Sequence, residues 1–189
     1  YKQSRRGNAR IDRAFAHALR HAGPHAIEVF SPYGYDERQF CSPGFDLPVG
    51  CLMRTPHGRF PEYHSSADDL AFVKPAALAD SLERLLEALR VLEGDRRYRN
   101  LSPKGEPQLG RRGLYRALAD RGADGDREMA LLWVLNLSDG THSLLDIAER
   151  SGLRFDAIRE AATLLAEHGP ERVPLVFVMV AFVIGIAVA

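Results

Sequence analysis

Cysteine and tryptophan are scarce in this chain of 189 residues, and neither sign of charge is in excess. Its two cysteines, Cys41 and Cys51, do not have the spacing of a zinc knuckle, and two thiols cannot make the disulfide framework of a small secreted domain. Lysine plus arginine equal aspartate plus glutamate, 25 against 25. The overall charge therefore carries no signal for a nucleic-acid partner, and the low cysteine content favours a reducing cytoplasm.

A signal peptide and an initiator methionine are also missing from the start of the chain, which opens in the basic polar segment Tyr1–Gly7. We expect the chain to be a fragment whose N-terminal part is missing. A long apolar run occurs only at Val173–Ala189, where its length is close to the lower limit of about 17 residues for a membrane span. Three readings stay open for this run: a membrane anchor, a strand of a small domain, or an end altered by truncation or a frame change.

The first half of the chain predicts helices, short strands and polar loops. Apolar residues at three-to-four spacing predict helices over Ile11–His21 and Pro75–Leu92. Strands are expected at Ala26–Phe30 and, buried, at Asp46–Met53, with the loop Ser31–Gly44 between them. The second helix carries an apolar stripe that is typical of a packing element. Its members are Leu78, Leu82, Leu85, Leu86, Leu89 and Leu92.

The second half predicts a compact helical module. Helices are expected over Glu128–Leu137, Ser143–Arg150 and Asp156–His168, and either Thr141 or Ser143 is expected to cap the middle one. The last two helices, with a glycine in the turn between them, are typical of a helix-turn-helix.

The last predicted helix of this module is acidic. It carries Asp156, Glu160 and Glu167 against Arg159, whereas helices that read DNA usually present several basic residues to phosphates. The composition therefore favours a protein-interaction or intramolecular role over DNA binding.

Ionisable side chains gather in two loops, Tyr33–Phe40 and Pro61–Leu70, on either side of the expected buried strand. Loops at the ends of a buried strand commonly carry active-site residues. In the second loop, His64 is followed by Asp68 and Asp69. A neutral imidazole binds zinc, and a nearby carboxylate can fix its tautomer; the alternative is an ordinary histidine of a surface loop.

Asp36, Glu37 and Arg38 form a charged triplet in the first loop. A carboxylate there could hydrogen-bond a catalytic acid or order a metal-bound water, and the alternative is a solvated loop with a local ion pair. Arg38 or Arg54 could bind a substrate carboxylate through two parallel hydrogen bonds. Either arginine could equally be structural.

Four segments of the first half form a specific pattern: Tyr33–Gly44, Leu47–Gly50, Met53–Arg54 and Glu62–Asp68. With this pattern the chain resembles a bacterial aminopeptidase-like family that is related to the zinc aminopeptidases and glutaminyl cyclases. The resemblance covers residues 1–169. It implies a zinc-exopeptidase α/β domain followed by a C-terminal winged helix.

The resemblance also implies roles for single residues. His64 matches the last metal ligand of zinc exopeptidases, in a Tyr-His-Thr-like motif where Ser65 replaces the threonine. Asp36 matches the aspartate of a Ser-Asp-His-like motif, which lies beside the catalytic acid, and Glu37 stands where the relatives have histidine. The other ligands and the general-base glutamate have no match between Tyr1 and Phe30, so most of the metal site is expected to lie outside this chain.

We therefore expect an α/β fold, a partial sheet of the phosphorylase/hydrolase type with helices, followed by a small helical winged-helix domain. The expected boundaries are 1–97 for the aminopeptidase-like part, 98–125 for a linker rich in glycine and proline, 126–172 for the winged helix-turn-helix and 173–189 for the apolar tail.

The expected function is zinc-dependent hydrolysis of peptide or amide bonds, inactive in the fragment alone and linked to polysaccharide biosynthesis. Asp36 and Glu37 are the catalytic candidates, Arg38 and Arg54 the substrate-binding candidates and His64 the zinc ligand. The alternative is a winged-helix module that binds DNA or another protein. The chain is expected in the cytoplasm, and the apolar tail would allow attachment to a membrane.

Overall fold

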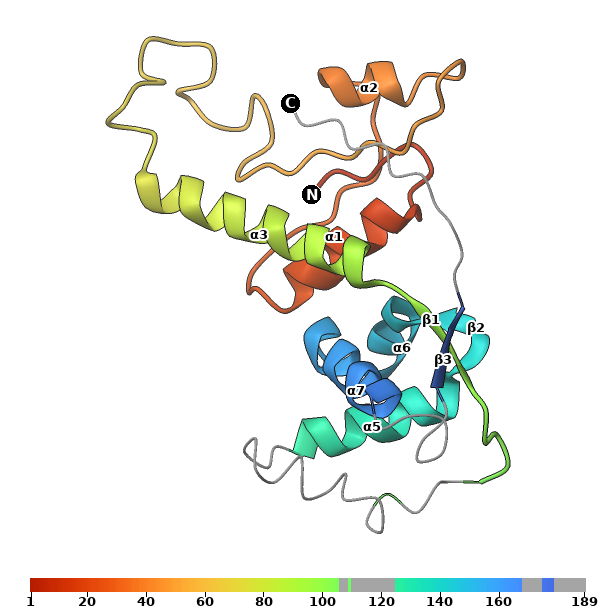
Figure 1. Ribbon diagram of the computed structural model, residues 1–189. Coiled ribbons are helices and arrows are strands. Elements are labelled where there is room, and N and C mark those ends of the chain that lie inside the picture. Colours follow the sequence, from red (N-terminus) through yellow and green to blue (C-terminus); the bar gives the residue numbers. More distant parts are fainter. Residues whose placement is uncertain (106–108, 110–124, 168–174, 179–189) are drawn as a thin grey trace. The chain divides into compact units, whose positions relative to one another are not determined.

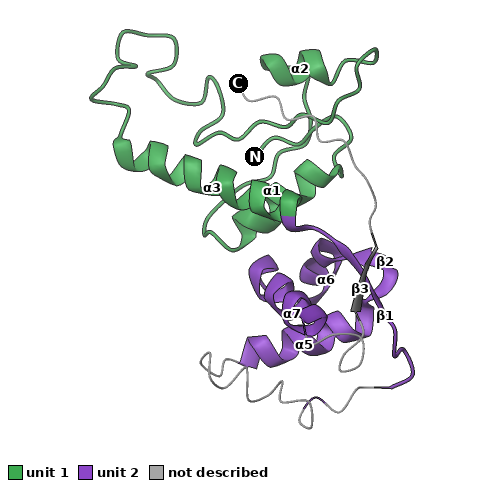
Figure 2. Cartoon of the chain, in the orientation of Figure 1, with its two compact units in different colours: residues 1–93, 183–189 green, residues 94–182 purple. Residues whose placement is uncertain are grey.

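The computed structural model of the chain describes residues 1–105, 109, 125–167 and 175–178 (Figure 1). The chain divides into two compact units, one formed by residues 1–93 and the other by the described residues from Gly94 onward (Figure 2). Helices make up most of the regular secondary structure of the described residues, and every strand among them belongs to the second unit.

The first unit contains three helices, α1 (Arg10–Arg20), α2 (Asp36–Phe40) and α3 (Pro75–Gly94). The helices predicted at Ile11–His21 and Pro75–Leu92 are confirmed as α1 and α3. These predictions succeed because apolar periodicity along a helix is a local signal that packing reinforces. The short helix α2 was missed, and lies inside the segment that the sequence predicts as a loop.

Asp12 fixes the beginning of α1 and ties it to the N-terminal segment. Its buried carboxylate accepts hydrogen bonds from the backbone N–H groups of Ser4 (2.7 Å) and Ala9 (3.0 Å), from the Ser4 hydroxyl (2.6 Å) and from the Tyr1 hydroxyl (3.1 Å). The Tyr1 ring also stacks on Phe15, with ring centroids 4.5 Å apart. A carboxylate in the first helical turn satisfies N–H groups that have no partner within the helix.

The two strands predicted for the first unit are wrong as regular strands. Lys2 forms a single parallel bridge with Glu28 and a single antiparallel bridge with Cys51, and these isolated pairs replace the expected ladders. Much of the segment Asp46–Met53 is also only half-buried, with Leu47 exposed, so the prediction of a buried strand fails there. The described residues of this unit thus form no regular sheet, and the expected α/β sheet is reduced to three extended segments side by side.

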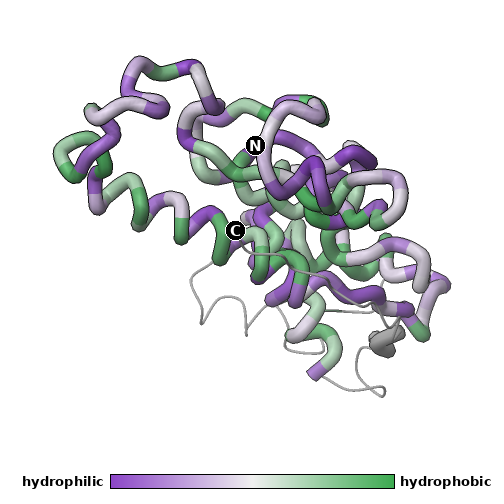
Figure 3. Tube along the Cα trace, turned by 90° about the horizontal axis from the view of Figure 1, so that it is seen from above, coloured by the Kyte–Doolittle hydropathy of each residue, from purple (hydrophilic) through white to green (hydrophobic). Residues whose placement is uncertain are grey.

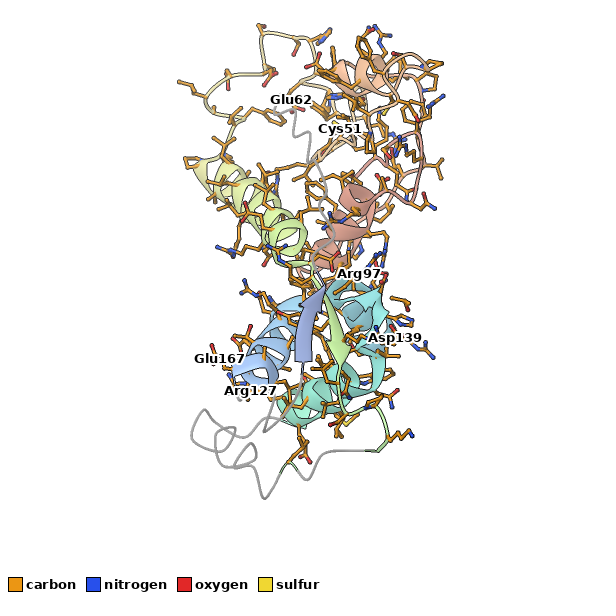
Figure 4. All side chains as sticks on the ribbon, turned by 45° about the vertical axis from the view of Figure 1, so that its right-hand side comes forward. Cys51, Glu62, Arg97, Arg127, Asp139 and Glu167 are labelled. Atoms are coloured by element: carbon orange, nitrogen blue, oxygen red, sulfur yellow. The ribbon has the colours of Figure 1, made fainter. Side chains whose placement is uncertain are left out.

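The second unit combines a small sheet with three helices. Its strands are β1 (Arg97–Asn100), β2 (Asp139–Ser143) and β3 (Leu175–Val178), in the order β2-β1-β3 with both pairings antiparallel. Figure 4 labels Arg97 on β1 and Asp139 on β2. β1 begins just before the predicted linker 98–125 and runs into it. Residues 106–108 and 110–124 of that segment lie outside the described residues.

The helices α5 (Gly125–Leu137), α6 (Leu144–Ser151) and α7 (Phe155–Glu167) confirm the three predicted helices of the second half. α5 packs on both α6 and α7, which also pack on each other (Figure 1). Apolar side chains fill the space between them. The core residues are Ala130, Leu131, Val134, Leu144, Leu145, Ile147, Ala148, Ile158, Ala162 and Leu165.

Local capping explains where α6 begins and ends. Ser143 is the N-cap: its hydroxyl accepts from the Asp146 N–H (3.2 Å), and the Asp146 carboxylate accepts from the Ser143 N–H (2.7 Å). The sequence left Thr141 and Ser143 open, and the structure selects Ser143. Gly152 ends the helix with φ of 73°, in the left-handed region where a side chain would be strained.

The apolar end of the chain is described only at β3, where Leu175 pairs with Asn100 and Val178 with Arg97. For these four residues, the reading as a strand of the small domain is confirmed. Residues 179–189 lie outside the described part. Within that part, every helix is too short or too polar to cross a bilayer.

Candidate functional site

A buried ion pair anchors the loop that carries the first group of candidate residues. The Lys2 ammonium lies 2.5 Å from Glu37 Oε1, and the two side chains are only 7% and 5% exposed. Lys2 also donates to the carbonyl oxygen of Tyr33 (2.7 Å), and Glu37 Oε2 accepts from the Tyr35 N–H (3.1 Å). The Lys2–Glu37 pair therefore holds the backbone on both sides of Gly34.

Gly34 is required by this arrangement. A Cβ atom at this position would lie 1.9 Å from Glu37 Oε1 and 2.7 Å from Lys2 Nζ. The charged atoms of Glu37 and Lys2 thus occupy the space that a side chain at residue 34 would need. Close approach of a backbone to other groups is one of the positions where glycine is needed.

Electrostatics agree with a charged Glu37. Burial alone would raise the pKa of its carboxyl group, but the hydrogen bonds from Lys2 and from backbone N–H groups outweigh burial and leave the pKa below its ordinary value. Glu37 is therefore an ionised, fully engaged carboxylate. Such a group positions its neighbours and is poorly placed to exchange protons with a substrate.

The Lys2–Glu37 pair places Tyr35 against the second candidate loop. The Tyr35 hydroxyl lies 2.5 Å from the Tyr63 hydroxyl and 3.3 Å from His64 Nε2. The rings of Tyr63 and His64 stack, with centroids 4.1 Å apart. The hydrogen bond to Tyr35 raises the pKa of Tyr63 to about 12. The two loops that the sequence singled out thus meet through Tyr35, Tyr63 and His64, which we call the Tyr35–His64 site.

Further aromatic rings support this site. The His57 ring packs edge to face on the Tyr35 ring, with centroids 5.0 Å apart. It is tilted against the Tyr63 ring, with centroids 5.8 Å apart. Phe60 packs edge to face on Tyr63 and stacks on Phe72. Aromatic pairs at such distances are stabilising beyond the area they bury, so the rings form a partly exposed aromatic cluster around the Tyr35–His64 site.

His64 itself has an unusual backbone and an accessible imidazole. Its φ of 56° lies in the left-handed region, which histidine adopts more often than most residues but which remains uncommon. The next residue, Ser65, donates its N–H to the Glu62 carbonyl (3.1 Å) and so closes a turn. The side chain is exposed.

The other candidates do not contact His64 among the described residues. Asp36 begins α2 and Arg38 is in its last turn, both exposed, and within the described residues neither forms a hydrogen bond or ion pair with His64. Arg54 lies 2.5 Å from Asp80 on α3, which lowers the pKa of that aspartate. Arg54 also lines a cavity of about 210 Å³ whose walls include neither Tyr35 nor His64. The structure therefore groups Glu37 and His64 through Tyr35, and separates Arg54 from them.

A metal needs more ligands than this site offers. Catalytic zinc is held by three protein ligands and a water, whereas the described residues contain no group of three histidine, cysteine or acidic side chains that could hold a metal ion. His64 is a suitable single ligand. The residues present do not fit a complete zinc site.

The sequence did not single out Tyr35, which belongs to the site, or Lys2, which anchors the loop that carries Tyr35. Lys2 lies in a basic segment that looks like an exposed chain end, and only its bridges to Glu28 and Cys51 reveal that it is buried. Tyr35 stands next to the charged triplet and was treated as part of a loop. A tyrosine beside candidate ligands is a weak signal that could have suggested a hydroxyl partner for His64.

Comparisons with known proteins agree with the division into two units. Residues 1–95 match the model of a domain of unknown function, DUF4910, and residues 96–170 match a winged helix-turn-helix model. A Clostridium acetobutylicum protein named "Putative polysaccharide biosynthesis protein with aminopeptidase-like domain" is 48% identical over 166 residues, which are 87% of this chain and 38% of that protein.

A solved structure is also similar. The crystal structure titled as that of a "putative peptidase" from Clostridium acetobutylicum superposes with a TM-score of 0.80 at 44% identity, covering 93% of this chain and 38% of that one. The chain therefore spans well under half the length of the relatives that it matches.

Proposed function

Because the chain belongs to the DUF4910 family and continues into a winged helix-turn-helix, we propose that it forms part of an aminopeptidase-like hydrolase of peptide or amide bonds. In this proposal His64 is one ligand of a zinc ion. The remaining ligands and the general base come from a part of the enzyme that these 189 residues do not supply. The names of the relatives, a peptidase and a polysaccharide biosynthesis protein with an aminopeptidase-like domain, support this reading.

The observation that carries the proposal is the meeting of the two candidate loops at His64. The accessible imidazole of His64 is held between the Tyr63 ring and the Tyr35 hydroxyl. The loop that carries Tyr35 is in turn fixed by the buried Lys2–Glu37 pair. Fixed orientation of a ligating histidine through a hydrogen-bonding neighbour is a general feature of metal sites. A surface histidine without function would need none of these supports.

The chemistry assigned to this chain is limited to positioning. Zinc bound in such an enzyme would activate a water and polarise the scissile carbonyl. Glu37 is proposed to act through Tyr35, because its carboxylate is buried and neutralised by Lys2. Asp36 and Arg38, which are exposed, remain candidates for contact with the substrate. Arg54 is assigned a structural role because it is paired with Asp80.

The proposed substrate is a peptide or amide with a free amino end, and the polysaccharide name of the relative raises an amide attached to a sugar precursor as a variant of the same chemistry. Both follow from likeness to relatives of which this chain covers 38%. The shared element is an amide bond next to a terminal amine.

Zinc analysis of His64→Ala tests the proposal. In a protein that joins these 189 residues to the rest of an aminopeptidase-like domain, we expect bound zinc that falls several-fold in the variant, since loss of one ligand weakens a three-ligand site. His25→Ala is the matched control, because His25 is an exposed histidine whose ring hydrogen-bonds to the Gly23 carbonyl (2.8 Å) and which takes no part in the Tyr35–His64 site. Zinc retained in full by His64→Ala would reject the assignment.

A second candidate function concerns the winged helix, which we infer to bind protein in preference to DNA. The exposed side of α7 offers Arg159, but its guanidinium lies 3.1 Å from Asp156, and Glu160 and Glu167 are exposed on the same helix. Figure 4 shows Glu167 at the end of α7. A helix with this charge repels a phosphate backbone.

A further inference from the structure

The exposed leucines of α3 are not explained by the packing of the first unit. Leu78, Leu82 and Leu86 are 61%, 55% and 40% exposed. We call them the leucine row. Side chains four positions apart lie on one face of a helix, so the row forms a continuous apolar strip along the N-terminal part of α3. Single exposed leucines are ordinary on a surface, whereas a contiguous strip marks a place of interaction.

The leucine row continues the face that α3 already buries. Ala88, Val91 and Leu92 are buried near the end of the helix. Leu85 and Leu89 are half-buried and, at 3.6 residues per turn, lie between the buried side chains and the row. Figure 3 shows the hydrophobic positions recurring along the helix. The apolar surface of α3 is therefore wider than the part that the first unit covers.

The segment just before α3 in the sequence carries further exposed apolar residues. Leu70 is 94% exposed, and Phe72 and Val73 are also exposed. With the leucine row, they make the sequence from 70 to 86 the main run of exposed large apolar residues among those described in this unit. Exposed apolar residues along a helix and in the segment before it are typical of a surface that contacts another polypeptide.

Two observations indicate what that surface is. The extended segments of the first unit pair only at Lys2, so its described part lacks the sheet on which the helices of an α/β domain normally pack. The matched relatives, one named for an aminopeptidase-like domain, extend far beyond the 38% that this chain covers. We propose that the leucine row docks an apolar face of the remaining part of an aminopeptidase-like domain. The proposal rests on the proposed function, because it takes this chain to be part of such a domain.

Co-expression of two polypeptides tests the proposal. The probe is the part of the Clostridium acetobutylicum relative outside the matched residues, carrying an affinity tag, and the second polypeptide is this chain. We expect the chain to be recovered with the probe, and Leu82→Glu or the pair Leu78→Glu and Leu82→Glu to lower recovery by at least about tenfold, as for central residues of an interface. Ala76→Glu is the matched control, because Ala76 is exposed and lies on the opposite side of α3 from Leu78.

Each outcome decides the proposal. Because the leucine row is exposed, the glutamate variants of the chain alone should keep its circular dichroism spectrum and melting temperature, which separates lost docking from unfolding. Failure of the chain to copurify, or equal recovery of the leucine variants, overturns the proposal. So does a dimer of the chain alone that Leu82→Glu converts to a monomer, since a second copy would then be the occupant. A complex that forms but binds no zinc refutes the proposed function and leaves the docking surface standing.

Discussion

At the scale of single residues, the site depends on a charge that is buried yet satisfied. Glu37 carries its negative charge in a nearly inaccessible position, and the Lys2 ammonium together with the Tyr35 N–H offsets the cost of removing it from water. Breaking a buried pair leaves one charge without compensation and costs about 3–5 kcal/mol. Because the pair also holds Gly34 and Tyr35, its loss would release the hydroxyl that faces His64.

The pH dependence of stability isolates Glu37. Its pKa is lowered in the folded chain, so its contribution to the free energy of unfolding is fully present above the ordinary glutamate pKa of about 4.3 and is lost as the pH falls through the lower folded value. We expect Glu37→Gln to destabilise the first unit at pH 7, and the difference from the parent chain to shrink below about pH 4.

Denaturant titrations at pH 7 and at pH 3, followed by NMR signals of the first unit, measure this difference. The exposed Glu93 gives the control variant Glu93→Gln, which should change stability little at either pH. A Glu37→Gln effect of the same size at both pH values would contradict the role assigned to the charge.

At the scale of elements, capping decides where the helix-turn-helix begins. Ser143 ends β2 and at the same time caps α6, so one residue joins strand and helix. The backbone of β2 is held locally by Asp139, whose carboxylate accepts from the N–H and hydroxyl of Thr141 and from the N–H of His142. Burial alone would raise the pKa of Asp139, but the hydrogen bonds together outweigh burial and lower the pKa well below its ordinary value.

Replacement of the cap tests its contribution. We expect Ser143→Ala to lower the free energy of unfolding of the second unit by about 1 kcal/mol, because the Asp146 N–H loses its partner. Thr141→Ala should cost less, since Thr141 is exposed and its hydroxyl serves only the turn. Thermal unfolding monitored by the fluorescence of Trp133 on α5 measures both. A larger loss of stability for Thr141→Ala than for Ser143→Ala would contradict the assignment of Ser143 as the N-cap.

At the scale of the whole molecule, charge limits the choice of partner. Basic and acidic residues are equal in number, and the exposed part of α7 is acidic. Nucleic-acid binding without sequence preference depends on released counterions and so on an excess of basic residues. The whole chain has no excess of basic residues, and α7 has none either.

Fluorescence anisotropy with a labelled DNA duplex checks this conclusion. At 50 mM salt we expect no binding stronger than about 10⁻⁴ M, the weak end of non-specific affinity. Glu160→Lys combined with Glu167→Lys should raise the affinity if charge is what prevents binding. Micromolar binding by the parent chain that weakens with salt and on Arg159→Ala would restore the DNA-binding alternative.

Local patterns predicted the helices and part of the site. The spacing of Leu78 to Leu92 and the acidic and apolar residues of α7 gave helices close to those observed, because helical periodicity needs only neighbours in sequence. His64 was found by its residue type and by resemblance. The strand predictions at Ala26–Phe30 and Asp46–Met53 failed because a strand exists only through its pairing partners. In this unit, the partner reaches them at Lys2 alone.

The sequence by itself determined the described helices other than the short α2 and the residue types available for chemistry, since periodicity and composition are properties of the chain. Only the tertiary structure decided that Lys2 is buried, that Glu37 is its neutralised partner and that Tyr35 reaches His64. It also decided that the leucine row is exposed, although the stripe looks like a core face in the sequence. Burial and charge compensation arise between segments far apart in the chain, so no local pattern contains them.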